Sequence, residues 1–234
     1  MLQLSEIKSD IQKSANPAKA KILQGFFKTG IGEYGEGDIF LGITVPKSRE
    51  IAVKHKNLSL NDIESLLKSK IHEERLIALL LLVHNYESNP EKREEIFNFY
   101  IKNTKYINNW DLVDLSSPGI VGNFLLKKDK SLLYKLAKSN NLWEKRIAIV
   151  STYYFIKNNE FSDTLKISEI LLKDAHDLIH KAVGWMLREA GKRDLKVLEV
   201  FLKEHYNQMP RTMLRYSIEK FPESKRKAYL KGKI

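Results

Sequence analysis

The sequence contains no cysteine, and this absence removes several classes of chemistry. Disulfide bonds, thiolate metal sites and cysteine nucleophiles are all excluded. Long apolar runs are missing too, because the most apolar stretch (79–83) is far shorter than the roughly 18 residues of a transmembrane helix. The first residues, MLQLSEIKSDIQKS, lack the layout of a secretory signal. We therefore expect a cytoplasmic protein with no membrane span.

Negative charge is scarce relative to positive charge. The 234 residues include 40 Lys and Arg against 29 Asp and Glu, which gives a formal net charge of +11. Such an excess favours a polyanionic partner, with nucleic acid first and an acidic membrane surface second. A basic protein without any such partner is the alternative.

Alternating apolar and polar residues, the pattern of β-strands, are also scarce, whereas apolar residues recur at three- and four-residue steps. This periodicity predicts an all-α protein. Asn16 and Asn89, each before a proline, and Ser59 are expected to cap the helices that follow them. The expected helices span residues 2–14, 17–28, 46–56, 59–69, 72–86, 90–102, 109–126, 128–139, 142–157, 160–173, 176–191, 193–206, 210–220 and 222–230.

Three of these segments resemble one another: HEERLIALLLL (72–82), LWEKRIAIVST (142–152) and LIHKAVGWMLR (178–188). Superposed at positions 76, 146 and 181, they are spaced by 70 and 35 residues, which indicates a repeat of 35 residues. Helix pairs of this length predict an α-solenoid of HEAT-like antiparallel helix pairs, with a generic helical bundle as the alternative. We expect one domain (1–234), comprising an N-terminal helix pair (2–28), a glycine-rich connector (29–43) and helical repeats (46–230).

A solenoid of this kind has a concave face lined by the second helix of each pair. Basic residues of those helices would gather there, and counterion release would then drive binding to a DNA backbone. Alternatively, these long side chains only solvate a helix face. The residues concerned are Arg75, Lys145, Arg146, His180, Lys181, Arg188, Arg211 and Arg215.

Glycine is concentrated in TGIGEYGEGDIFLGI (29–43), which holds five of the 11 glycines. The segment lacks the Gly-Lys-Ser/Thr of a phosphate-binding loop, and its acidic residues Glu33, Glu36 and Asp38 would repel phosphate. We interpret it as a connector to the helix at Pro46, with a mobile lid as the alternative.

One of three tryptophans lies beside two acids in NNWDLVD (108–114). Asn109 is expected to cap a helix that begins at Trp110, and Asp111 in its first turn is explained by the helix dipole. Asp114 shares a helix face with Trp110 and has apolar neighbours, which indicates an exposed, paired or functional carboxylate. Pro118 cannot donate to the carbonyl of residue 114, so a kink is expected there.

The other two tryptophans also have basic neighbours. Lys181, Trp185 and Arg188 share a helix face, and Gly184 leaves room for another backbone or a ligand. Trp143 begins a helix three residues before an arginine. Core packing is the alternative for each tryptophan.

Other site classes have little support. His176 and His180 have the spacing of metal ligands, but no third-ligand motif accompanies them. The Gly-x-Ser-x-Gly elbow of serine hydrolases and the dinucleotide fingerprint are absent. We expect neither a metal site nor a cofactor.

Five motifs together carry a family resemblance: NP-x-KA (16–20), FLGI-x-x-P-x-x-R (40–49), WDLVD (110–114), LW-x-x-R (142–146) and GW-x-LRE (184–189). With them the chain resembles the bacterial DNA alkylation repair glycosylases of the AlkD type, which are built from HEAT-like repeats. The resemblance implies that Asp114, Trp110 and Trp185 form the excision site, with Arg146 beside them. We expect DNA contacts from Arg146, Lys145, Lys181, Arg188, Arg75 and Arg211.

The resemblance further implies a substrate and a partner. The expected activity is excision of N3- and N7-alkylated purines, such as 3-methyladenine and 7-methylguanine, from double-stranded DNA without base flipping. We expect a monomer in the bacterial cytoplasm, associated with the nucleoid, with no obligate protein partner and no membrane partner. The alternatives are a non-catalytic HEAT-like protein that binds branched or distorted DNA, and a protein-interaction scaffold.

Overall fold

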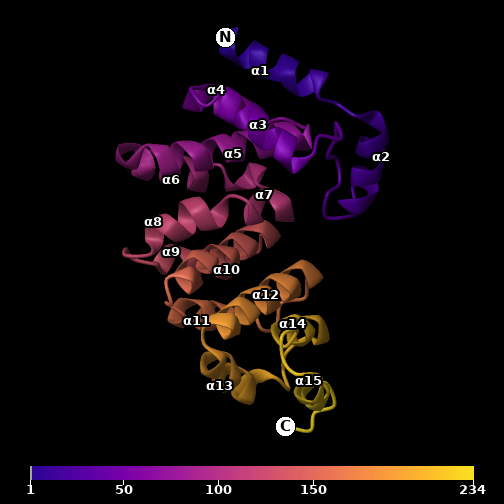
Figure 1. Cartoon of the computed structure of the whole chain (residues 1–234), viewed down its shortest axis with the longest axis vertical. Coiled ribbons are helices and arrows are strands. Elements are labelled where there is room, and N and C mark those ends of the chain that lie inside the picture. Colours follow the sequence, from indigo (N-terminus) through magenta and orange to yellow (C-terminus); the bar gives the residue numbers. More distant parts are fainter. Residues whose placement is uncertain (1) are drawn as a thin grey trace. The chain divides into compact units, whose positions relative to one another are not determined.

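The computed structural model describes residues 2–234, and these form an all-α protein (Figure 1). Among them the one strand-type pairing is an isolated parallel bridge between Ile39 and Ile71. No helix in the described part of the chain has both the length and the apolar character needed to cross a membrane. Contacts group the chain into two compact units, which we call unit 1 (up to Ser116) and unit 2 (Ser117–Ile234).

Unit 1 is built around one long buried helix. This helix, α5, is buried over most of its length and packs against α3, α4 and α6, while α1 contacts α3 and α5. The elements are α1 (Leu2–Lys13), α2 (Pro17–Phe26), α3 (Val45–Lys54), α4 (Leu60–Leu67), α5 (His72–Ser88), η1 (Pro90–Lys92), α6 (Arg93–Lys102), η2 (Thr104–Tyr106) and α7 (Trp110–Asp114).

Unit 2 contains a row of adjacent helices, because α12 packs between α10 and α14 (Figure 1). Helices α9 and α11 pack against α10, and α13 packs against α12, so pairs of helices stack as expected for a solenoid. The elements are η3 (Pro118–Gly122), α8 (Asn123–Leu125), α9 (Ser131–Ala137), α10 (Leu142–Lys157), α11 (Ser162–Ile170), α12 (Asp177–Arg193), α13 (Leu195–His205), α14 (Arg211–Ser217) and α15 (Glu223–Leu230).

Capping chemistry explains several helix starts. The side chains of Asn16 and Ser59 accept hydrogen bonds from the third backbone N–H that follows each, which confirms both predicted caps. The predicted cap at Asn89 is wrong. Its amide donates instead to the carbonyl of Asn85, and a short 3₁₀ turn (η1) precedes α6.

The predicted helix 109–126 is interrupted where Pro118 was expected to kink it. Helix α7 ends at Asp114, and η3, a turn of π-helix, begins at the proline, which lacks the N–H needed to continue an α-helix. The kink is therefore a complete break. It leaves Asp114 as the last residue of a short helix, at the end where the helix dipole disfavours a negative charge.

Gly184 allows two helices of unit 2 to approach closely, as its position before Trp185 predicted. A Cβ at this position would lie 2.6 Å from the carbonyl oxygen of Met213 and 2.5 Å from the Cβ of Tyr216, both on α14. The space left by the missing side chain of Gly184 is thus occupied by atoms of α14.

We expect Gly184→Ala to lower the stability of the protein. Overpacking costs about 1–3 kcal/mol, which exceeds the gain of about 1 kcal/mol from the better helix propensity of alanine. Denaturant unfolding measures the difference. The control is Gly25→Ala on α2, where an added Cβ meets nothing within 4 Å and stability should stay equal or rise. A Gly184→Ala protein as stable as Gly25→Ala would contradict the packing argument.

Candidate active site

Unit 1 contains a cavity of about 470 Å³, and the two residues singled out in NNWDLVD both line it. Trp110 begins α7, capped by the side chain of Asn109, which accepts from the Trp110 N–H at 2.8 Å. Asp114 ends the same helix, and both side chains are half-buried. The remaining walls come from α2, α5 and the segment between α2 and α3, and they are almost entirely apolar.

Four rings form a cluster on one side of this cavity, in which His72 also contacts Phe27 with ring centroids 5.1 Å apart. His72 stacks on Phe40 with ring centroids 4.4 Å apart, and Phe40 stacks on Phe27 at 4.9 Å. Phe27 in turn stacks on Trp110 at 5.1 Å, nearly parallel at 11°. Phe26 contacts the indole edge-on at 5.9 Å. One indole face is therefore covered by Phe27.

A buried group of charges surrounds the His72 ring. His72, which is 1% exposed, places Nδ1 3.1 Å from Asp38 and Nε2 2.8 Å from Asp111. The guanidinium of Arg75 lies 2.7 Å from the same oxygen of Asp38, and Asn109 donates to it at 3.4 Å. Burial alone lowers the pKa of His72, but the hydrogen bonds to Asp111 and Asp38 outweigh burial and raise it above its ordinary value.

Asp38 shows the complementary effect. Burial, the largest single influence, raises the pKa of its carboxyl, but the hydrogen bond from His72 and the charge of Arg75 outweigh burial and hold that pKa below its ordinary value. Asp111 lies in the first turn of α7, as predicted, and accepts from the Leu112 N–H at 2.8 Å, but its contact with His72 was not foreseen.

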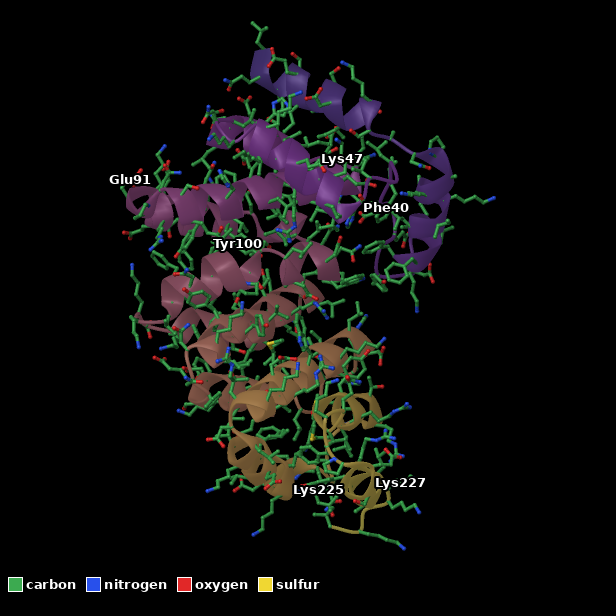
Figure 2. All side chains as sticks on the ribbon, viewed as in Figure 1. Phe40, Lys47, Glu91, Tyr100, Lys225 and Lys227 are labelled. Carbon is green, nitrogen blue, oxygen red and sulfur yellow. The ribbon has the colours of Figure 1, made fainter. Side chains whose placement is uncertain are left out.

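The glycine-rich segment 29–43 is more than the connector that the sequence suggested. Its second half is buried and supplies Asp38 and Phe40 (Phe40 is labelled in Figure 2). The carboxylate of Glu73 on α5 accepts hydrogen bonds from the N–H groups of residues 41, 42 and 43 at 2.7 to 3.1 Å. The run of apolar residues after Asp38 was the available signal that this part of the segment is packed.

Unit 2 holds the third predicted catalytic residue. Trp185 lies on α12, half-buried, with its ring 5.8 Å from that of Tyr153 on α10. Lys181 and Arg188 lie on the same helix. Trp143, by contrast, is buried in the core of unit 2, in agreement with the packing alternative.

Each predicted DNA-contacting cation of unit 2 that reaches the surface has a partner within that unit. Lys145 lies 2.6 Å from Asp174, and Lys181 lies 2.6 Å from Asp177. Arg188 pairs with Glu219 and with Glu189, and Arg211 donates to the carbonyl of Leu230 at 2.6 Å. To bind Lys145, Lys181 or Arg188, a polyanion would have to replace the carboxylate that each of them contacts.

Arg75 and Arg146 differ from the exposed positions expected for them, because their side chains are only 4% and 5% exposed. Arg75 donates to the carbonyl of Ser69 at 2.8 Å, in addition to its contact with Asp38. Arg146 donates to the carbonyl of Leu178 at 2.6 Å. Both guanidinium groups satisfy interior acceptors, since a buried arginine must be paired.

The two histidines with metal-ligand spacing have local structural roles. His176 caps α12, where its Nδ1 accepts from the Leu178 N–H at 3.1 Å. The Nε2 of His180 lies 2.5 Å from the carbonyl of Asp174. Across residues 2–234, no group of three or more His, Asp or Glu side chains is arranged to hold a metal ion.

Comparisons with known proteins give a consistent result. A family profile described as "DNA alkylation repair enzyme" matches residues 7–221. Among solved structures, the chain is similar to a "Predicted DNA alkylation repair enzyme from Enterococcus faecalis", with 17% identity and a TM-score of 0.69 over 90% of this chain and 98% of that chain. At this identity the likeness is one of fold. A search of curated proteins gave no match.

Proposed function

The chain belongs to the family of DNA alkylation repair enzymes, and on this premise we propose that it is a DNA glycosylase for cationic N3- and N7-alkylated purines. The substrates would include 3-methyladenine and 7-methylguanine in double-stranded DNA, and the reaction would be hydrolysis of the N-glycosidic bond. The observation that supports this proposal most directly is the pairing of Asp114 with Trp110 on the wall of one apolar cavity.

The chemistry of a cationic lesion suits a site with one carboxylate. An alkylated purine already carries positive charge, so it can leave without being protonated by a general acid. The sugar then develops oxocarbenium character, as in glycosidases. Asp114 would stabilise that cation and hold or deprotonate the attacking water. The apolar walls of the cavity strengthen this attraction, because charges interact more strongly away from bulk water.

Aromatic faces would assist the same step. The indole of Trp110 is backed by Phe27, so its other face is the one that could meet the deoxyribose through cation–π attraction. For Trp185 of unit 2 we propose a contact with the DNA, as the family resemblance implies. No second acid is required, and the base would stay stacked in the duplex rather than enter a pocket.

Four cations of unit 2 are our candidates for contact with the DNA backbone: Lys145, Lys181, Arg188 and Arg211. Each is at least partly exposed, and three of the four are paired with carboxylates that phosphates could replace. Released counterions would then contribute to affinity, which should fall steeply as salt rises. We assign Arg75 and Arg146 to holding elements of their own units together, since both are buried.

The decisive experiment is incubation of the protein with methylated duplex DNA, followed by chromatography of the released bases. We expect 7-methylguanine and 3-methyladenine to be released, and no release of uncharged lesions such as 1,N⁶-ethenoadenine, because no second acid protonates the leaving group. Salt-dependent binding without any base release would instead support the alternative, a non-catalytic DNA-binding protein. No binding to DNA at moderate salt would contradict both.

A further inference from the structure

We propose that His72 is a positioning residue of the excision site, and that its imidazolium form bridges Asp38 and Asp111 and thereby holds Trp110 in place. The inference rests on the proposed glycosylase function. His72 itself is 1% exposed and is assigned no contact with DNA. It would act on Trp110 through Asp38, Asp111 and the neighbouring aromatic rings.

The protonation state follows from the geometry of the two contacts. A neutral imidazole has one N–H group, so it can donate to only one of two carboxylates. Both ring nitrogens of His72 lie within hydrogen-bond distance of a carboxylate oxygen, at 3.1 Å for Asp38 and 2.8 Å for Asp111. An ionised carboxylate only accepts hydrogen bonds, so the cation is the form that satisfies both contacts.

The surrounding charges agree with this assignment. Asp38 and Asp111 face the imidazole directly, and Arg75 is the opposing cation. Glu73, on the same turn of α5, directs its carboxylate to backbone N–H groups of the glycine-rich segment. Asp114 lines the same cavity and adds negative charge. The acids thus outnumber the arginine around this buried ring, which favours its charged form.

The two carboxylates belong to different elements, and this is why the contact would position the site. Asp38 lies on the segment that carries Phe40, and Asp111 lies in the first turn of α7, directly after Trp110. The His72 ring also stacks on Phe40, which connects through Phe27 to the indole. The imidazolium therefore joins α5, α7 and the glycine-rich segment at one point.

Loss of the proton from His72 should weaken the contacts that join α5, α7 and the glycine-rich segment. One of the two carboxylates would lose its hydrogen bond from His72 while remaining buried, which is destabilising even though each keeps another partner. Because the pKa of His72 is raised in the folded state, this stabilisation is complete below its unfolded value of 6.5 and is lost as the pH rises through the folded value. The excision rate should decline over the same pH range, because small misplacements at a reacting centre are costly.

The test combines His72→Gln with spectroscopy of the unaltered protein. Glutamine carries no positive charge, and its two N–H donors are on one nitrogen, so it cannot reproduce the contacts of two separate ring nitrogens. We expect single-turnover release of 7-methylguanine to fall about 10–100-fold, with the affinity for DNA changed by less than about twofold. The matched control is His55→Gln, which removes a histidine–carboxylate contact of 2.8 Å to Asp10 outside the cavity and should leave the rate unchanged.

Nuclear magnetic resonance of the imidazole gives a readout that does not depend on activity. At pH 7 both ring nitrogens of His72 should carry protons, and the Trp110 indole N–H resonance should shift with the titration of His72. If His72→Gln does not fold, the unaltered protein still decides, because its rate must follow that titration. A neutral His72 at pH 7, or a rate independent of its titration, would overturn the inference. Absence of base release by the unaltered protein would instead refute the glycosylase proposal, and the resonance experiment would still decide the protonation state.

Discussion

Replacing Asp114 with asparagine should reduce the release of 7-methylguanine by about 10²–10³-fold while leaving DNA affinity nearly unchanged. The size follows from the loss of a preorganised charge at a developing cation, which is commonly of this order. Asparagine keeps the shape of the side chain and one acceptor oxygen, so the change removes the charge without opening a void. Single-turnover kinetics on methylated duplex DNA, with binding measured separately, gives both quantities.

The helix dipole and the apolar cavity both disfavour a negative charge at Asp114. It is the last residue of α7, where the helix dipole disfavours an anion, and it faces a cavity whose walls are nearly all apolar. We therefore expect Asp114→Asn to retain the fold. Loss of both rate and stability would point to a structural role instead.

The matched control for charge is Glu91→Gln. Glu91 is an exposed residue of η1 in the same unit, and Figure 2 shows it on the opposite side of that unit from Phe40. The substitution removes one negative charge just as Asp114→Asn does. An equal fall in rate for both variants would show that net charge, rather than the carboxylate in the cavity, is what matters.

Local chemistry made the start of the site predictable from the sequence. Asn109 is a residue type that caps helices, so Trp110 could be placed at a helix start and Asp114 on its face. Pro118 likewise made an interruption after α7 predictable. These features depend on neighbours within a few residues, which a single sequence displays directly.

Contacts between distant segments were not predictable in the same way. His72 and Asp111 are 39 residues apart, and nothing in either local pattern indicates the other. Phe27, Phe40 and Trp110 form their stack only after the glycine-rich segment has folded back onto α5. For this reason the expected connector is in fact a wall of the cavity.

The buried arginines illustrate the same limit. Helical periodicity places Arg75 and Arg146 near the starts of long helices, and a surface position is the usual fate of arginine. Their burial depends on acceptors supplied by other segments, namely Asp38 and Ser69 for one and Leu178 for the other. A basic repeat in a sequence therefore overstates the charge that the surface presents.

Glu73→Ala should lower the free energy of unfolding by about 3–5 kcal/mol, because it leaves several buried donors without an acceptor. The Glu73 carboxylate is 1% exposed and receives hydrogen bonds from the N–H groups of Leu41, Gly42 and Ile43. Alanine would leave these donors facing a void, and buried donors without partners are costly. Denaturant unfolding measures the loss.

Two comparison variants separate the causes of that loss. Glu73→Gln keeps one carbonyl oxygen for the N–H groups and should lose about half as much, because charge-assisted bonds are roughly twice as strong as neutral ones. Glu74→Ala removes the neighbouring acid, which is also buried but lies 3.9 Å from the partly exposed Lys8, and should cost less than Glu73→Ala. Equal losses at positions 73 and 74 would contradict the role assigned to the three N–H groups.

The consequences of Glu73→Ala should be traceable along the chain by hydrogen exchange. Protection should fall first at the amides of residues 41–43, which lose their acceptor. It should fall next at Asn16, whose N–H donates to the carbonyl of Leu41 at 2.7 Å and links the start of α2 to this segment. Phe40 would lose its support as well, so base release should weaken even under conditions where the variant is folded. The same buried carboxylate would thus maintain both the stability of unit 1 and the shape of its cavity.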